Sequence, residues 1–180
     1  MRKFGVFAAT IFISIILAGI FGIIHDQVTY SISPEYFTKF KYQQFGFEPS
    51  SFGGHRQTVA VIGFLATWWV GLMIGIVIGF TTLIYPDHKS MRKASTRGIG
   101  IVFITAVVFG FIGFLRGRYY LSKTGVNWWL PEGLINRDDF ITVGSVHNYS
   151  YLGGGIGLLL SVIYLCVKKN HFVQQHSTHK

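Results

Sequence analysis

Five side chains in this sequence could together hold a metal ion, because they combine imidazole nitrogens with carboxylate oxygens. These residues are His25, Asp26, Glu35, His55 and His147. Zinc, copper and iron all accept ligands of these two types. We predict His25, Glu35, His55 and His147 as the ligands of one site, provided that the surrounding elements bring all four to one place.

Other interpretations of these histidines stay open. Their spacing matches no compact metal motif such as HExxH or CxxC. Histidines at a membrane boundary can also bond only to water, lipid headgroups or backbone carbonyls. Haem is a further alternative, with His25 and His147 as paired axial ligands, although the chain has no CxxCH for covalent attachment. The cofactor is therefore left open among copper, iron, zinc, haem and none.

Four long apolar stretches must position these residues, at about 4–24, 58–85, 98–115 and 149–167. Each is close to the ~20 residues that an α-helix needs to cross the hydrocarbon core of a bilayer. None has Lys, Arg, Asp or Glu in its interior, where a charge costs at least ~2.5 kcal/mol. We predict one integral membrane domain over residues 1–180, an all-α bundle of four transmembrane helices.

Basic residues predict the orientation of the bundle. The two terminal segments and the loop after residue 85 together have nine basic residues and one acidic residue. The loops 25–57 and 116–148 together have seven basic and six acidic residues. The positive-inside rule then places both termini and the tail 168–180 in the cytoplasm, and the two long loops outside. A cleaved signal peptide is the alternative for the first stretch. One membrane face accounts for nearly all of the net charge of +9, so we predict no nucleic-acid partner.

The first outer loop contains a short predicted helix that starts near Ser33. Ser is a favourable N-cap, Pro34 suits the first helical position, and Glu35 lies where the helix dipole favours an anion. Tyr36 and Phe40 share one face. We expect this amphipathic helix to cap the bundle together with the loops.

Small residues recur every four positions in the second stretch, at Gly63, Thr67, Gly71, Gly75 and Gly79. This spacing places them on one helix face, where they allow close backbone contact in lipid. The partner could be another span, another membrane subunit or a second copy of the chain, and we predict self-association or subunit contact through Gly71, Gly75 and Gly79.

Two strings resemble those of a group of small bacterial inner-membrane proteins with four predicted spans and no assigned activity. They run from His25 to Phe40 and from His147 to Gly154. The resemblance implies a bacterial inner-membrane setting and carries over no functional residue.

Several function classes are disfavoured by what the sequence lacks. It has no Walker loop, no GxGxxG after a strand, no GxSxG, and no charge at mid-membrane as a proton pump or voltage sensor would need. The leading prediction is a metal-binding membrane protein with its site at the periplasmic face and a redox or metal-handling role. The alternative is a non-catalytic accessory or scaffold subunit of a larger membrane complex. Whether the protein is an enzyme is left open.

Overall fold

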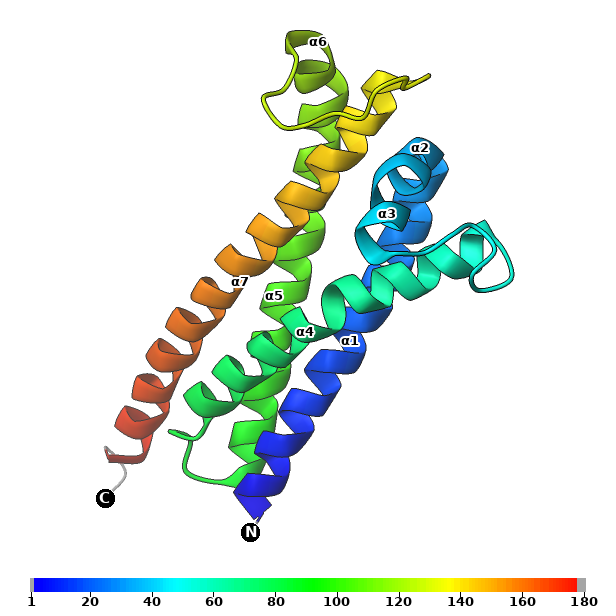
Figure 1. The fold of residues 1–180 in the computed structure, drawn as a ribbon. Coiled ribbons are helices and arrows are strands. Elements are labelled where there is room, and N and C mark those ends of the chain that lie inside the picture. The colour runs from blue at the N-terminus through cyan, green and yellow to red at the C-terminus, as the bar shows by residue number, and fades with distance from the viewer. Residues whose placement is uncertain (1, 178–180) are drawn as a thin grey trace.

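Four long helices make up most of the protein in the computed structural model, which describes the backbone of residues 2–177 and the side chains of residues 2–169. They are α1 (Arg2–Ile32), α4 (His55–Thr82), α5 (His88–Arg116) and α7 (Arg137–Ser177), and the described residues contain no strand. All four are long and apolar enough to cross a membrane. The predicted all-α fold with four transmembrane helices is confirmed (Figure 1).

Both ends of the bundle are easily identified in Figure 1. The N-terminus, the C-terminus and the connection between α4 and α5 lie at one end, here called the termini end. The opposite end, here called the cap end, holds the short helical segments. These are α2 (Pro34–Tyr36), η1 (Phe37–Lys41), α3 (Tyr42–Phe45), η2 (Gly117–Leu121) and α6 (Ser122–Thr124).

The predicted capping helix is present as the run from Pro34 to Phe45. Ser33 is its N-cap, and the Ser33 side chain accepts a hydrogen bond from the backbone N–H of Tyr36 at 3.3 Å. The run buries its apolar face in a core that it shares with α4 and α7, made of Tyr36, Phe37, Tyr42, Val59, Ile62, Phe140 and Val143.

The helices extend beyond the predicted apolar stretches, so much of the predicted outer loops is helical. In the outer loops, α1 continues to Ile32 and α7 begins at Arg137, and at the other end α5 begins at His88. Hydropathy marks only the apolar part of a helix, whereas hydrogen bonding of the end groups decides where it begins. At the start of α5, for example, the side chain of Asp87 accepts from the backbone N–H groups of Lys89 and Ser90 at 2.8 and 3.0 Å.

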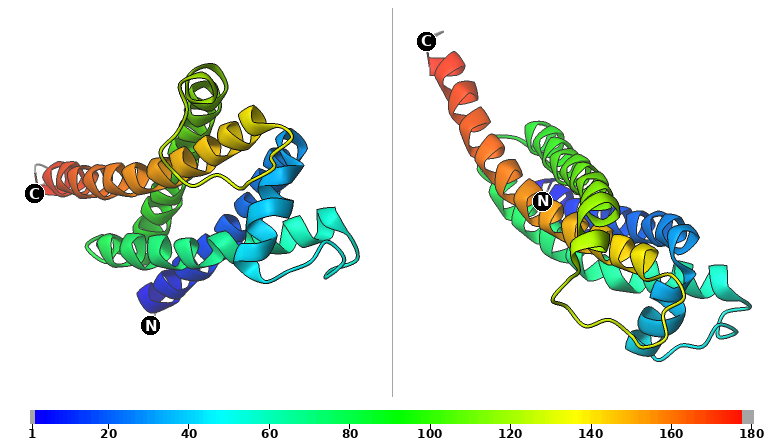
Figure 2. Two further views of the ribbon diagram at one scale, coloured as in Figure 1. Left: turned by 45° about the horizontal axis from the view of Figure 1, so that its top comes forward. Right: turned by 90° about the horizontal axis from the view of Figure 1, so that it is seen from above.

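The long helices pack as two close pairs, α1 with α4 and α5 with α7, which Figure 2 shows from two further directions. Small residues make both contacts possible. A Cβ added at Gly75 would lie 2.7 Å from the Cα of Ile11 in α1. In the other pair, a Cβ at Gly153 would lie 2.7 Å from the backbone oxygen of Thr105.

The glycine face of α4 therefore meets α1 of the same chain. Added Cβ atoms at Gly71, Gly75 and Gly79 would each collide with α1. The close helix contact predicted for this face is thus made within the chain, and self-association or subunit contact through these three residues stays a prediction.

Two hydrophobic cores join the helix pairs, one at each end of the bundle. The core at the cap end is the one described above. The core at the termini end includes Ile78, Tyr85, Met91 and Leu165, and the Tyr85 hydroxyl donates to the backbone oxygen of Leu165 at 2.9 Å. A cavity lined by all four long helices also lies between the two pairs.

Candidate functional site

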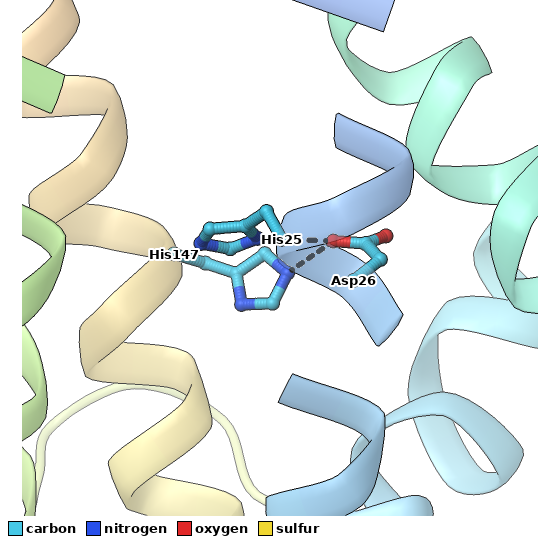
Figure 3. A group of neighbouring side chains, drawn as sticks. All are labelled: His25, Asp26 and His147. Atoms are coloured by element: carbon cyan, nitrogen blue, oxygen red, sulfur yellow. Dashed lines mark hydrogen bonds and ion pairs between the residues drawn. The ribbon is translucent and has the colours of Figure 1, made fainter. Parts of the chain in front are cut away.

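Three of the chemically interesting side chains meet where the two helix pairs face each other, towards the cap end. His25 and Asp26 lie in α1, and His147 lies in α7, 121 residues after Asp26 (Figure 3). The Asp26 Oδ1 atom is 3.1 Å from His25 Nδ1 and 3.1 Å from His147 Nε2. One atom of each residue lies within 4.8 Å of the other two. We call these three residues the His/Asp cluster.

Asp26 and His147 of the His/Asp cluster are buried, and His25 is partly exposed. Asp26 is 4% exposed and His147 is 5% exposed. The cap helix supplies part of the cover, because the Tyr36 ring stacks on the His147 ring with centroids 4.8 Å apart. The His25 ring meets His147 edge to face at 4.6 Å. The side chains thus have little freedom to leave the cluster.

The second nitrogen of each imidazole also has a partner. His147 Nδ1 lies 2.9 Å from the backbone oxygen of Val143, which can only accept a hydrogen bond, so this nitrogen carries a proton. His25 Nε2 lies 3.2 Å from the hydroxyl oxygen of Ser150 and can donate to it. The carbonyl of Val143 thus fixes the tautomer of a neutral His147 and leaves a lone pair on His147 Nε2. The hydroxyl of Ser150 can donate or accept, so His25 Nδ1 can either donate to Asp26 or present a lone pair.

The lone pair of His147 Nε2 points at Asp26 Oδ1, which is itself an acceptor. With a neutral His147, no hydrogen lies between these two atoms, whereas His25 Nδ1 can donate to Asp26 Oδ1. The second carboxylate oxygen, Asp26 Oδ2, is buried and has no hydrogen-bond partner among the described residues. A buried unpaired acceptor costs about 1–3 kcal/mol. The cluster is therefore rich in acceptors, and a proton, a hydrogen-bond donor or a metal cation would relieve it.

The spacing of the cluster suits a small metal ion. Zinc binds His and carboxylate ligands at about 2.0–2.2 Å, which puts the ligand atoms of a tetrahedral site about 3.4 Å apart. The two contacts of 3.1 Å to Asp26 Oδ1 would need to lengthen only slightly. Haem does not fit between the two histidines, because their rings are already in edge-to-face contact.

Glu35 lies outside the His/Asp cluster and has a structural role. Its two carboxylate oxygens accept from the backbone N–H groups of Ile135 and Asn136 at 3.0 and 2.8 Å, just before α7 begins. These two donors hold the pKa of the Glu35 carboxyl below its usual range, with a smaller contribution from Lys39. Glu35 thus ties the cap helix to the start of α7.

His55 also lies outside the cluster. Its Nδ1 atom is 3.1 Å from the hydroxyl of Tyr42, and its ring stacks on those of Tyr42 and Tyr30. Among the described residues, the structure brings His25 and His147 together and places neither Glu35 nor His55 with them.

Asp26 takes the place that the sequence analysis gave to Glu35. Its position was obscured because the first apolar stretch ends at residue 24, whereas α1 continues to Ile32. An acid inside a membrane helix is a strong functional signal. Lys41, outside the cluster, is a second buried charged residue: it is 7% exposed, burial lowers its pKa, and the negative charge of Asp26 opposes that effect.

Comparisons with family models, curated proteins and solved structures give no match to this chain. The class that the fold and the site define is a multi-pass membrane protein with a buried cluster of two histidines and an aspartate.

Proposed function

We propose that the protein binds a transition metal through His25 Nδ1, the Asp26 carboxylate and His147 Nε2. The observation that carries the proposal is the direction of the His147 Nε2 lone pair. Val143 fixes the tautomer of His147, so that its free nitrogen faces Asp26 Oδ1 at 3.1 Å. A cation between these acceptors would also lie near the unpaired Asp26 Oδ2.

Two histidines and one carboxylate are a ligand set found for zinc and for non-haem iron, and imidazole also suits copper. Three protein ligands leave at least one coordination position for another molecule. A closed structural site would have no such open position. The composition therefore favours a site that acts on a bound molecule or one that transfers the metal to another carrier. It supports the redox or metal-handling role.

The setting we propose is the bacterial inner membrane, with the cap end on the periplasmic side. The cap end carries the nearly balanced loops, and the termini end carries most of the basic residues. The His/Asp cluster, which is nearer the cap end, would then be loaded from the periplasm.

Elemental analysis of the purified protein tests the proposal directly. We expect one equivalent of metal in the wild type, and loss of it in His147→Ala and Asp26→Asn. His55→Ala is the matched control, because it removes a histidine of the same end of the bundle that lies outside the cluster. Metal loss in His55→Ala together with retention in His147→Ala would contradict the assignment of ligands.

Metal retention should also depend on pH. A ligating imidazole must be deprotonated, and an unperturbed imidazole has a pKa of about 6.5. We expect metal affinity to fall as the pH drops below about 6.5, measured by competition with a chelator of known affinity. An affinity unchanged down to pH 5 would contradict ligation by histidine.

An accessory subunit without chemistry is the second candidate. Exposed aromatic and apolar side chains at the cap end favour it, with Trp129 65% and Ile135 93% exposed. Two observations together would support this second function. The purified protein would contain no metal, and variants of the His/Asp cluster would co-purify with the same partners as the wild type.

A further inference from the structure

A cavity of about 300 Å³ lies between the two helix pairs, next to the His/Asp cluster. All four long helices contribute to its wall, and His25 and His147 are part of that wall. Small-molecule sites span roughly 300–1,000 Å³ and are mostly apolar with a few converging polar groups. This cavity has that composition, because its other lining is largely aliphatic and aromatic, including Phe21, Trp69 and Phe103.

The packing of the helices explains why the space is there. Glycine and other small residues are used within each pair, where they let α1 meet α4 and α5 meet α7. The two hydrophobic cores close the space between the pairs only near the ends. Several lining side chains are also exposed on the outside of the bundle, among them Leu17, Trp69 and Phe103. The cavity therefore reaches the surface that faces lipid.

Donors and acceptors are matched differently at the two ends of the cavity. Thr67 and Ser14 also line it, but their hydroxyls donate to backbone oxygens of Ala18 and Thr10, both at 2.8 Å. At the other end, His25 and His147 line the cavity, and Asp26, which contacts both rings but does not itself line the cavity, has one unpaired oxygen. A complementary occupant is therefore apolar along most of its length and carries a hydrogen-bond donor at one end.

We propose that this cavity binds a lipid-soluble phenol or hydroquinone whose hydroxyl donates to the His/Asp cluster. The aromatic wall favours a ring over an alkyl chain. The excess of acceptors favours a hydroxyl over a carbonyl or an ether, because only the hydroxyl supplies the missing proton donor. A lipid acyl chain would fill the apolar part and leave the cluster unsatisfied. The proposal concerns binding and does not depend on a bound metal.

Binding of a short-chain alkyl hydroquinone to chelator-treated protein in detergent provides the test, with tryptophan fluorescence as the readout because Trp69 lines the cavity. We expect saturable binding, and at least tenfold weaker binding of the dimethyl ether of the same compound. One lost hydrogen bond of about 1.4 kcal/mol corresponds to that factor. Equal affinity of the two compounds would overturn the proposed donor.

Gly154→Leu tests the location. Gly154 lines the cavity, and a Cβ added there would meet no atom within 4 Å, so a leucine can enter the space without striking a helix. We expect at least tenfold weaker binding of the hydroquinone. Gly100→Leu is the matched control, because an added Cβ there also meets nothing and Gly100 does not line this cavity. Wild-type affinity in a folded Gly154→Leu protein would overturn the site.

Gly155→Leu provides a second variant of the same kind if Gly154→Leu does not fold, since Gly155 also lines the cavity with open space around it. Because chelator is present throughout, a failure of hydroquinone binding is distinct from a failure of metal binding. Protein that binds metal without the hydroquinone would leave the proposed function standing and remove this inference alone.

Discussion

At the scale of residues, Asp26 distinguishes this site from an ordinary group of buried histidines. Val143 is the partner of one nitrogen of His147, and Ser150 is the partner of one nitrogen of His25. Asp26 adds a carboxylate with one oxygen shared by both rings and one without a partner. The position of the two histidines could be predicted from their places near helix ends, but the role of Asp26 depends on a helix that continues past its apolar stretch.

Glu35 shows why residue type alone misleads. The sequence offers it as a carboxylate near three histidines, and its position in the first turn of a helix was predicted correctly. Its partners, the backbone N–H groups of Ile135 and Asn136, lie 100 and 101 residues away. Sequence spacing does not reveal such a contact, because any acceptor at the cap end could accept hydrogen bonds from these two backbone N–H groups equally well.

Glu35→Gln should lower the thermal stability at neutral pH. Folding lowers the pKa of Glu35. The ionised carboxylate therefore stabilises the folded state at pH values above the pKa of the unfolded chain, about 4.3. This stabilisation is lost as the pH falls through the lower pKa of the folded state. The difference in midpoint between wild type and variant should therefore shrink below about pH 4. Thermal unfolding in detergent at pH 7 and pH 3.5 measures it. A difference that grows in acid would contradict the capping role.

At the scale of elements, the four-residue spacing of small side chains correctly marked the close helix contacts. It did not identify the partner of each face. The choice of partner depends on long-range contacts in the folded chain, such as the hydrogen bonds from Lys3 of α1 to the backbone oxygens of Leu83 and Tyr85. The close partner of α4 is its predecessor among the long helices, α1.

Gly75→Leu should destabilise the α1–α4 pair. A Cβ at this position would be 2.7 Å from the Cα of Ile11, so the backbones must separate. Overpacking of this kind costs about 1–3 kcal/mol, and more where backbone atoms collide. A lower unfolding midpoint in detergent is expected, with Gly100→Leu unchanged because its surroundings are open. Equal midpoints for Gly75→Leu and the wild type would mean that α1 does not cover this face.

At the scale of the whole molecule, two helix pairs are joined by a core at each end and by the His/Asp cluster between them. The transmembrane fold could be predicted because hydropathy over ~20 residues is a local property. The cavity could not be, because it results from how two pairs meet. Its wall combines residues from all four long helices, and none of the stretches shows on its own that it borders a space.

The orientation of the whole bundle is the last prediction, and the proposed loading of the site from the periplasm depends on it. Both termini and the basic connection between α4 and α5 lie at the same end of the bundle, so the protein has two possible orientations. The excess of basic residues at the termini end favours its placement in the cytoplasm. A reporter fused after Lys180 should be active only in the cytoplasm.

Labelling of a single cysteine tests the orientation independently. Ile135→Cys in a Cys166→Ser background should react with a membrane-impermeant thiol reagent added outside intact inner membranes, since Ile135 is 93% exposed at the cap end. Labelling only after the membrane is opened, together with a periplasmic reporter signal, would show that the bundle has the opposite orientation. The His/Asp cluster would then lie towards the cytoplasm, and its metal would have to be supplied from inside the cell.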